Sequence, residues 1–463
     1  MPEFRSGDTI AALATPPGEG GIAVIRMSGP EAFKITEQFL RRRRNSDWQQ
    51  VPTHTIHSGE ICDAAGRVID QVLISLFRSP QSYTGEDVIE ISSHGGTAIT
   101  RKILELLFQN GARHAEPGEF TRRAFLNGKI DLTQAEAVID LIKAKSDKSL
   151  ETAIQQLAGS LSRKFKALKD DMMQLCAHLE AHLDFPDENL EVYSDVEFAA
   201  KFSCLESELE RLIASFKRGT LLREGAMVVI AGKPNVGKSS LFNALLERDR
   251  ALVSEFPGTT RDRLEEDLQI AGIRIRLVDT AGLTAIAEHP LDQMGMEKTR
   301  QTLLEGDLFL YIVDGSRPLE EADSLVFEEL KEGVPVTVLI NKSDLRQELD
   351  RRSLENFTGQ QELFSISTKS GEGLDQLESR IADILLKQIS AEGEQITRLR
   401  HKQALTEALG ALKRASGAFH QKESLEFVAV DLKASLDALR ELVGEVYSED
   451  LLDVIFAEFC IGK

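Results

Sequence analysis

Residues 232–239 read Gly232-Lys-Pro-Asn-Val-Gly-Lys-Ser239 and fit the pattern G-x-x-x-x-G-K-[ST]. They follow the strand-like run Met227–Ala231 and precede the helix-like run Ser240–Leu246. Glycines in such a loop let backbone N–H groups point at phosphate oxygens. We expect the lysine to neutralise the β- and γ-phosphate oxygens and the serine hydroxyl to bind Mg²⁺. The predicted contacts to the nucleotide are Asn235, Val236, Gly237, Lys238, Ser239 and Ser240.

Strand-like and helix-like segments alternate on both sides of this loop, from about residue 224 to 386. Such alternation predicts a doubly wound α/β unit with a mainly parallel sheet. Helical patterning flanks it on both sides, so the α/β unit is predicted to be inserted into a helical domain. The predicted strands are Met227–Ala231, Ile273–Asp279, Leu308–Asp314, Val336–Asn341 and Leu363–Ile366.

Two further motifs end predicted strands in the same unit. In Asp279-Thr-Ala-Gly282 the carboxylate can hold magnesium through water, and the last amide can sense a γ-phosphate. In Asn341-Lys-Ser-Asp344 the carboxylate of Asp344 can accept both N1–H and N2–H₂ of guanine, a donor pair that adenine lacks. Three motifs on successive strand ends select GTP. The residues assigned to these contacts are Asp279, Thr280, Ala281, Gly282, Asn341, Lys342 and Asp344, with Ser367, Thr368 and Lys369 for backbone contacts to O6.

The residue after the Asp279–Gly282 motif is Leu283, where many GTPases place a glutamine that orients the attacking water. Glu288 and Asp292 are the nearby carboxylates, and both also suit solvated loop charges. No arginine finger is identifiable, although Arg261 and Arg263 lie in the expected switch. A bound monovalent cation would supply the missing charge, and the Asn235 side chain offers it an oxygen.

From Thr9 to about Leu126 the chain shows short β-like runs broken by glycine and proline, with one helix expected after Gly96, which predicts an α+β domain. The runs are Thr9–Ala14, Ile22–Met27, Val72–Phe77 and Val88–Ser92.

The period changes to that of a helix near Asp131. Thr133-Gln-Ala-Glu136 fits a capping box, and one face is predicted to carry Leu132, Ala135, Ile139 and Ile142. An acidic turn at Asp184–Glu188 interrupts the helical pattern, which resumes near Arg398. In the last helix we expect Ser448 as the N-cap and a buried stripe of Leu452, Ile455, Phe456 and Phe459. Cys460 is expected to be a small buried residue on this face.

The composition bounds the class of protein. The 463 residues suggest roughly three domains, and 42% hydrophobic with 28% charged residues is ordinary for globular proteins. The net charge of −20 opposes a broad nucleic-acid-binding face. Four scattered cysteines favour a reducing compartment. With no secretory signal visible and no apolar run long enough to span a bilayer, we expect a cytoplasmic protein.

These motifs, with Leu221-Leu-Arg-Glu-Gly225 and Phe459-Cys-Ile-Gly-Lys463, resemble the tRNA-modification GTPases of the MnmE (TrmE) type. Further runs across the chain resemble the same family: Ala14–Gly18, Gly20–Arg26, Ser82–Asp87, Pro117–Phe120 and Ala124–Asn127. The resemblance implies a multidomain α+β and α/β fold. Its expected parts are an N-terminal folate-binding and dimerisation domain at 1–127, a helical domain at 128–222 and 387–463, and an inserted P-loop G domain at 223–386.

The resemblance also implies an activity. With an FAD-containing partner of the MnmG (GidA) type, in a heterotetramer, a homodimer of this chain would add a carboxymethylaminomethyl-type group to carbon 5 of the tRNA wobble uridine. The one-carbon unit would come from 5-formyltetrahydrofolate or a related reduced folate, and the partner would hold most of the tRNA. Potassium and GTP would pair the G domains.

Residue roles carry over from the resemblance position by position. Potassium would be coordinated by Asn235, Ser254, Phe256 and Thr259, and magnesium by Ser239 and Thr260. The loop around potassium, which also contacts GTP, is Ser254, Glu255, Phe256, Pro257, Gly258, Thr259 and Thr260. The folate-binding positions are Arg26, Glu90, Lys129 and Lys463.

One position departs from the family pattern. The family usually has a catalytic glutamate three residues before the glycine that matches Gly295, and this chain has Asp292 there. Asp292 is the predicted catalytic carboxylate, with Glu288 as the alternative because the segment is one residue longer than usual.

Two other functions remain open from the sequence. One is a switch that regulates ribosome assembly or signalling through effector binding alone. The other is a folate-dependent methyl- or aminomethyltransferase with an accessory GTPase that needs no tRNA.

Overall fold

The computed structural model describes residues 7–42, 51–184, 193–252, 265–279, 305–328, 330, 333–359, 361–389 and 393–463. These residues form two compact units. One contains residues up to Ile142, Gln156–Leu205 and Glu407–Lys463, and the other contains Lys143–Gln155 and Glu206–Thr406. No helix among the described residues is long and apolar enough to cross a bilayer. The domain boundaries expected from the sequence stay a prediction.

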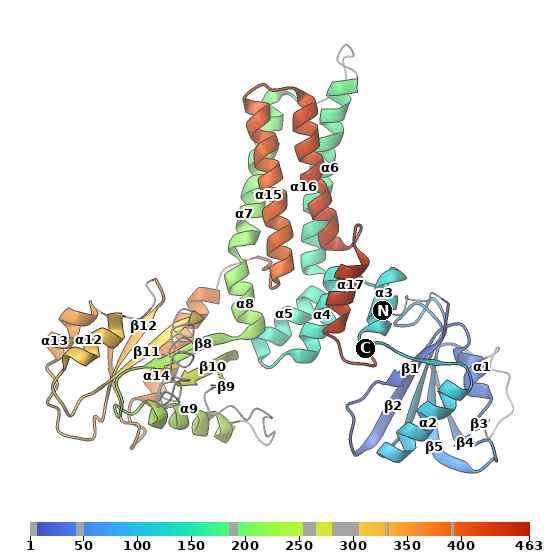
Figure 1. The fold of residues 1–463 in the computed structure, drawn as a ribbon, viewed down its shortest axis with the longest axis horizontal. Helices are drawn as coiled ribbons and strands as arrows, with labels where there is room; N and C mark the ends of the chain where they lie inside the picture. Colours follow the sequence, from blue (N-terminus) through green and yellow to red (C-terminus); the bar gives the residue numbers. More distant parts are fainter. Residues whose placement is uncertain are drawn as a thin grey trace, which may run out of the picture. The chain divides into compact units, whose positions relative to one another are not determined.

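The N-terminal part is an α+β fold built on a seven-stranded sheet, as predicted (Figure 1). The strand order is β3-β4-β5-β6-β2-β1-β7, with every pair antiparallel except β1 with β7. Its elements are β1 (Ile10–Leu13), β2 (Gly20–Ser28), α1 (Ala32–Glu37), β3 (Leu40–Arg42), β4 (Thr55–Cys62), β5 (Val68–Phe77), β6 (Val88–Gly95), α2 (Thr97–Gln109), β7 (Arg113–His114) and α3 (Glu119–Leu126).

Helices α1 and α2 cover one face of this sheet. Ile25, Ile74 and Ile91 point to that face and are buried with Ile35 of α1 and Ile103 of α2. Alternate residues of each strand face the other way, because side-chain direction alternates along a strand. Arg26 and Glu90 therefore lie on the opposite face, which the two helices do not cover.

The helical elements come from segments on both sides of the α/β insertion, as predicted. Helix α6 packs along α16, and Phe198 and Phe202 of α7 contact Phe419 of α15. The helices are α4 (Leu132–Lys143), α5 (Asp147–Leu157), α6 (Ser160–Asp184), α7 (Asp195–Ala214), α8 (Phe216–Glu224), α15 (Leu399–His420), α16 (Leu425–Val443) and α17 (Glu449–Ala457).

The N-terminus of α4 differs from its prediction. The reciprocal cap joins Asp131 and Gln134: Asp131 Oδ1 accepts from the Gln134 amide, and Gln134 Oε1 accepts from the Asp131 amide. Thr133 lies inside the helix and donates to Asp131. Ile142 is 45% exposed rather than part of the buried face. The acidic turn expected at Asp184–Glu188 lies outside the described residues after Asp184.

The last helix matches its prediction, except at the tail. Ser448 caps α17 by accepting from the Leu451 amide. The stripe of Leu452, Ile455, Phe456 and Phe459 is buried against α3 and α4. Cys460 is exposed rather than buried, because α17 ends at Ala457 and the helical spacing that would place Cys460 on the apolar face does not extend to it.

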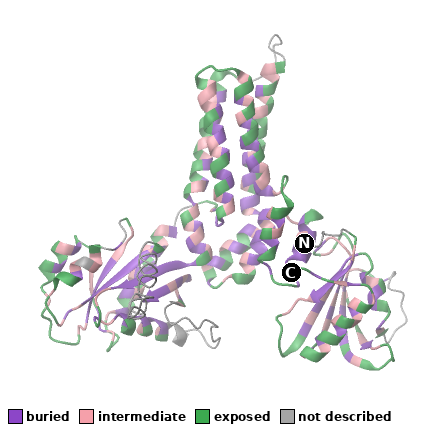
Figure 2. Ribbon diagram, viewed as in Figure 1, coloured by how far each residue is buried: buried purple, intermediate pink, exposed green. Residues whose placement is uncertain are grey.

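The inserted unit is doubly wound, with strand order β13-β12-β11-β8-β10-β9. All pairs are parallel except β9 with β10. One face is buried against α8, α9 and α14, and the other against α12 and α13, so buried residues line the strands (Figure 2). The elements are β8 (Ala226–Ala231), α9 (Lys238–Leu252), β9 (Glu265–Ile270), β10 (Ile273–Asp279), β11 (Leu308–Asp314), α12 (Glu321–Glu328), β12 (Val336–Asn341), α13 (Arg351–Thr358), β13 (Leu363–Ser365) and α14 (Leu374–Ile389).

Candidate functional site

The glycine-rich loop connects β8 to α9, as the motif predicts. All six residues of β8 are buried, so the strand holds the start of the loop rigidly. Gly232 and Gly237 have positive φ values of 151° and 105°. A Cβ at Gly232 would clash with the Ile312 carbonyl, and one at Gly237 with the Asn341 side-chain amide. Both glycines are therefore required by close approach as well as by backbone conformation.

Lys238 lies at the start of α9 and is almost fully buried. Its ammonium donates to the backbone oxygens of Gly232 and Lys233, each at 2.7 Å. Burial lowers the pKa of Lys238, and the Asp279 carboxylate opposes that change. The cation is thus enclosed by the loop that the motif assigns to phosphate oxygens.

The two described residues predicted at the magnesium site contact each other. The Ser239 hydroxyl donates to Asp279 Oδ2 at 2.7 Å, which joins the start of α9 to the end of β10. A hydroxyl and a carboxylate oxygen at this separation form the hard-oxygen donor set that Mg²⁺ prefers. The site therefore fits magnesium in its chemistry.

The third motif follows β12 and is tied to the glycine-rich loop. Asn341, which is 1% exposed, donates from Nδ2 to the Val236 carbonyl at 2.8 Å and accepts from the Thr368 amide at 3.1 Å. The Ser367 hydroxyl donates to Asp344 Oδ1 at 2.8 Å. Three loops that are far apart in sequence are thus brought to the carboxyl ends of β8, β12 and β13, where open α/β sheets bind ligands.

Several predicted residues lie outside the described part of the chain. They are Ser254, Glu255, Phe256, Pro257, Gly258, Thr259, Thr260, Thr280, Ala281, Gly282, Glu288 and Asp292. Their roles stay predictions. Of the predicted potassium ligands, only Asn235 is described, and it has a positive φ of 66° in the loop.

A second group of predicted residues gathers in the N-terminal part. Arg26 on β2 faces Glu90 on β6, with Nε and Nη2 at 2.9 and 2.8 Å from Oε1. Arg26 Nη1 also donates to the Gly462 carbonyl at 3.4 Å. Burial first, and then the Arg26 charge, lowers the pKa of Lys463, while Glu90 opposes the change. The C-terminal tail thus brings a second cation to the Arg26–Glu90 pair.

Lys129 is not part of this contact set. Its ammonium donates to the Pro80 carbonyl at 2.9 Å, and its stem lies near Gly85. Lys129 therefore lies against the loop of residues 79–87. That loop also carries Tyr83, whose ring is 5.4 Å from the Arg26 guanidinium.

Sequence reasoning missed the aromatic residues beside Arg26. Phe120 lies 5.7 Å from the guanidinium on the side opposite to helices α1 and α2. Its amide donates to the Lys463 carbonyl at 3.2 Å, and the Tyr83 hydroxyl is 2.8 Å from Thr121 Oγ1. Both aromatic residues occur in runs that the sequence singled out only for family resemblance.

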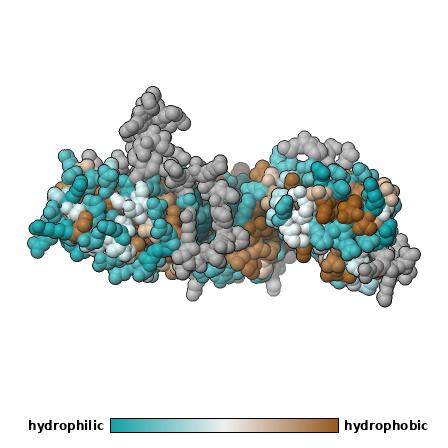
Figure 3. Space-filling model, turned by 90° about the horizontal axis from the view of Figure 1, so that it is seen from below, coloured by the Kyte–Doolittle hydropathy of each residue, from teal (hydrophilic) through white to brown (hydrophobic). Residues whose placement is uncertain are grey.

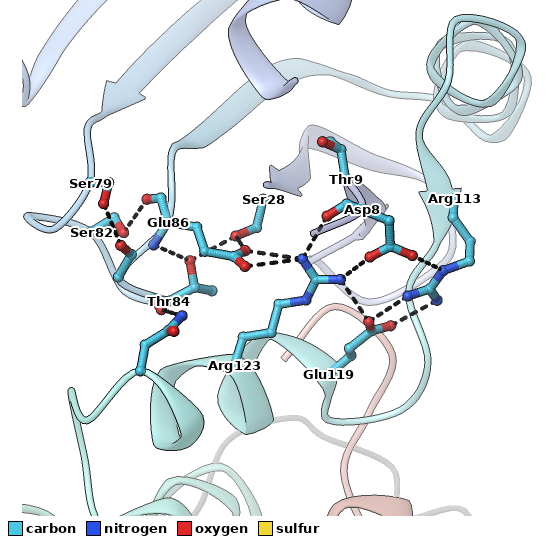
Figure 4. Close-up of polar contacts among 12 residues, drawn as sticks. Asp8, Thr9, Ser28, Ser79, Ser82, Thr84, Glu86, Arg113, Glu119 and Arg123 are labelled. Atoms are coloured by element: carbon cyan, nitrogen blue, oxygen red, sulfur yellow. Dashed lines mark hydrogen bonds and ion pairs between the residues drawn. The ribbon is translucent and has the colours of Figure 1, made fainter. Parts of the chain in front are cut away.

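A network of ion pairs lies on the chain segments that carry these aromatic residues (Figure 4). Arg123 donates to Asp8 at 2.5 Å, to Glu119 at 3.0 Å and to Glu86 at 3.1 Å. Arg113 donates to Glu119 at 2.6 Å and to Asp8 at 2.7 Å. Glu119 and Arg123 are buried, and their i, i+4 spacing on a helix was the available sequence signal. The network joins α3 to Asp8, which precedes β1, and to the loop of residues 79–87.

Comparisons with known proteins agree with these features. The family model described as the GTP-binding protein TrmE N-terminus matches residues 9–129, and the MnmE helical domain model matches residues 132–460. The tRNA modification GTPase MnmE of Carboxydothermus hydrogenoformans is 42% identical over 462 residues, covering 98% of this chain and 99% of that protein. The protein of the same description from Geobacillus thermodenitrificans is 40% identical over 472 residues, covering 100% of both.

A crystal structure of Era in complex with MgGDPNP and nucleotides 1506–1542 of 16S ribosomal RNA is 26% identical. It covers 40% of this chain and 66% of that chain at a TM-score of 0.28, a value too low to support a conclusion.

Proposed function

The chain belongs to the MnmE family of tRNA modification GTPases, and we propose that it installs a carboxymethylaminomethyl-type group at carbon 5 of the tRNA wobble uridine with a flavoprotein partner. A reduced folate supplies the one-carbon unit, and GTP hydrolysis drives the cycle. The observation that carries this proposal is the presence of two sites in one chain: a guanine-nucleotide site and the cluster of Arg26, Glu90 and Lys463. A switch that acts only through effectors has no need of the second cluster.

At the nucleotide site the chain supplies charge and orientation. Lys238 neutralises the phosphate oxygens, and Ser239 and Asp279 would hold magnesium. Bound magnesium neutralises charge that develops on the β- and γ-phosphate oxygens. Asp344 binds the guanine edge, with its orientation set by the Ser367 hydroxyl.

Potassium would complete the nucleotide site. Leu283 cannot orient water, and Asn235 offers an oxygen in the glycine-rich loop. The positive φ of Asn235 supports the idea, because a non-glycine residue in that conformation marks a specialised position. Asp292, or else Glu288, would position the attacking water.

The N-terminal cluster suits a reduced folate by its donor set. Arg26 and Lys463 provide positive charge for a carboxylate, and Glu90 can accept from a pterin N–H edge. The aromatic rings of Tyr83 and Phe120 fix the Arg26 guanidinium. The bound folate would supply the one-carbon unit, while these residues bind and orient it.

The proposed homodimer would use the uncovered face of the N-terminal sheet. Ile22 and Ile56 on this sheet are 70% and 66% exposed, and apolar side chains gather at the surface of this part in the space-filling view (Figure 3). A hollow of about 420 Å³ next to Leu73 and His94 opens on the same sheet. Apolar surface of this kind often marks an interaction site.

The flavoprotein partner of the MnmG type would join two copies of this chain in a heterotetramer. Because a net charge of −20 disfavours broad contact with phosphates, the partner would hold most of the tRNA. The tRNA and the reduced folate are then brought together in the cytoplasm.

Mass spectrometry of wobble nucleosides tests the proposal in a strain that lacks the chain. We expect the wild-type gene to restore the modified uridine, and Arg26→Ala and Lys238→Ala each to abolish it. Arg101→Ala is the matched control, since Arg101 is exposed on α2. A deletion strain with an unchanged set of wobble uridines would refute the function.

A further inference from the structure

Lys342 of the Asn341–Asp344 motif is held from two sides. Its ammonium lies 2.5 Å from Asp314 Oδ2 and 3.4 Å from the backbone oxygen of Asn235. Asp314 is the last residue of β11 and pairs in register with Asn341 at the end of β12. The ion pair therefore joins the loop of residues 341–344 to the end of the neighbouring strand β11, beside the glycine-rich loop.

Asp314 is itself oriented by its surroundings. The amide and hydroxyl of Ser316 donate to Asp314 Oδ1 at 3.0 and 2.7 Å, and the side chain is 10% exposed. Burial opposes ionisation, but the contacts with Lys342 and Ser316 hold the pKa of Asp314 below its ordinary value. Asp314 is thus a fixed, ionised partner, and its other oxygen is left to Lys342.

The backbone at Lys342 needs such a partner. Lys342 has a φ of 65°, a left-handed conformation that is uncommon for a residue with a side chain. Gly315 lets the two strand ends approach: its amide donates to the Asn341 carbonyl at 2.9 Å, and a Cβ there would clash with Gln347. Strained backbone at a ligand site persists where neighbouring contacts over-determine it.

We propose that Asp314 is a positioning residue for the guanine-nucleotide site. Asp314 holds Lys342 and thereby the loop that presents Asp344 to the base. The inference rests on the guanine-nucleotide binding proposed above. Asp344 follows Lys342 by two residues, so the conformation at Lys342 sets where the Asp344 carboxylate lies. Asp314 acts through Lys342 and does not touch the nucleotide.

A purely structural role for Asp314 predicts a different result. If Asp314 only joined the ends of β11 and β12 through Ser316, its loss would weaken binding whether or not Lys342 were present. If it acts through Lys342, its loss has no further effect once the lysine is gone. A double-mutant cycle separates the two cases, because residues in one contact network give non-additive changes.

The test uses the full chain and a fluorescent GDP analogue, with stopped-flow measurement of association and dissociation rates. We expect Asp314→Asn to weaken GDP binding by roughly tenfold, mainly through faster dissociation, as for loss of one charged contact. Lys342→Ala should give a loss of similar size, and the double variant should match Lys342→Ala within about twofold. GTP turnover of Asp314→Asn at saturating nucleotide should stay within about twofold of wild type, since Asp314 does not touch the nucleotide and only affinity is affected.

Two variants serve as controls. Arg317 is 74% exposed, and its Nε lies as far as 3.9 Å from Asp314 Oδ2. Because this exposed ion pair is long, Arg317→Ala should leave GDP affinity unchanged. Asp314→Glu keeps the charge and should recover part of the affinity lost in Asp314→Asn, which also covers the case in which that variant folds poorly. Affinity of Asp314→Asn within twofold of wild type, or the same loss with and without Lys342, overturns the inference. Absence of GDP binding to the wild-type chain would instead overturn the proposed nucleotide site.

Discussion

Asp344 is the residue on which the choice of guanine depends. Its carboxylate is held by the Ser367 hydroxyl at 2.8 Å, and a carboxylate can accept two N–H groups from guanine. Hydrogen bonds to a charged group contribute about 1.5–3 kcal/mol, so Asp344→Asn should weaken GTP binding roughly tenfold to a hundredfold. The amide of Asn donates to a carbonyl, so the variant should accept xanthosine triphosphate.

Equilibrium titration with GTP and xanthosine triphosphate measures both effects. Glu348→Gln is the matched control, because Glu348 is an exposed carboxylate of the same segment. Unchanged GTP affinity in Asp344→Asn would remove Asp344 from the base site.

Arg26 is the corresponding residue for the folate. It is paired with Glu90 and lies beside Lys463, so its loss removes one of the two cations near the Glu90 carboxylate. Arg26→Ala should weaken binding of 5-formyltetrahydrofolate by roughly tenfold or more. Calorimetry on the full chain measures this, with Arg101→Ala as the control. Equal binding heats for Arg26→Ala and wild type would place the folate elsewhere.

Motif residues were predictable one by one, whereas their partners were not. Ser239 and Asp279 were both assigned to magnesium, and the structure brings them within 2.7 Å. The sequence offers no spacing rule that pairs Asp314 with Lys342 or Phe120 with Arg26, because these contacts join different elements. Lys129 was grouped with Arg26 by resemblance, and the hydrogen bond described for its side chain is to the Pro80 carbonyl.

At the scale of elements, helix α3 depends on the buried ion-pair network. Burial raises the pKa of Glu119, but Arg113, the Glu116 amide and Arg123 outweigh it, so the pKa of Glu119 lies below its ordinary value of 4.5. The pKa of Asp8 is also lowered. A carboxylate with a lower pKa in the folded state stabilises the fold at pH values above its ordinary pKa. This stabilisation is lost as the pH falls through the lower pKa of the folded state. Glu119→Gln should cost roughly 3 kcal/mol at pH 6, the low end for breaking a buried pair, and less at pH 3.5.

Pulse-labelling hydrogen exchange on α3 peptides, after equilibration in urea at each pH, measures the stability of this region in the full chain. Glu116→Gln is the control, because Glu116 is exposed next to the network. If Glu119→Gln and wild type lost stability equally between pH 6 and pH 3.5, Glu119 would not be the source of the pH dependence.

Elements with a clear period were predictable, and elements made by pairing were not. The strands β8, β10, β11 and β12 match their predicted ranges closely, because they are long apolar runs. Strand β9 was missed: Glu265-Glu-Asp-Leu-Gln-Ile270 has little strand propensity and forms by pairing with β10 along its whole length. Neighbouring strands override intrinsic propensity in such cases. The cap of α4 was predicted two residues late, since both Asp131 and Thr133 are good capping residues and only the structure chooses between them.

At the scale of the whole molecule, the insertion of the α/β unit was predictable from the change of period on both sides. The packing of α6 along α16 is the structural counterpart, because it joins helical segments from before and after the insertion. Which side of the N-terminal sheet is left uncovered was not predictable, since strands β4 and β3 and helix α1 were not expected from the sequence.

Potassium dependence belongs to this scale, because it links the nucleotide site to the pairing of two chains. The transition state of GTP hydrolysis needs added positive charge near the β–γ bridge. Leu283 cannot orient water, and no arginine finger is evident in the sequence, whereas Asn235 presents an oxygen in the loop. Sodium is smaller and would be held poorly by oxygens spaced for potassium. GTP turnover should therefore be at least roughly tenfold faster in potassium than in sodium, as for other transition-state charge contacts.

Turnover per molecule should also rise with protein concentration if the ion is enclosed when two G domains pair. Asn235→Ala should lower turnover in potassium without loss of GDP binding, since Asn235 contributes its side chain to the ion and not to the base. Asp292→Ala should lower turnover and leave ion-induced pairing intact, because a residue that positions water acts after the chains have paired. The same result for Glu288→Ala, with Asp292→Ala active, would move the catalytic role to Glu288. Equal rates in the two salts, across concentrations that span pairing, are incompatible with a potassium-completed site and would require the added charge to come from the chain itself.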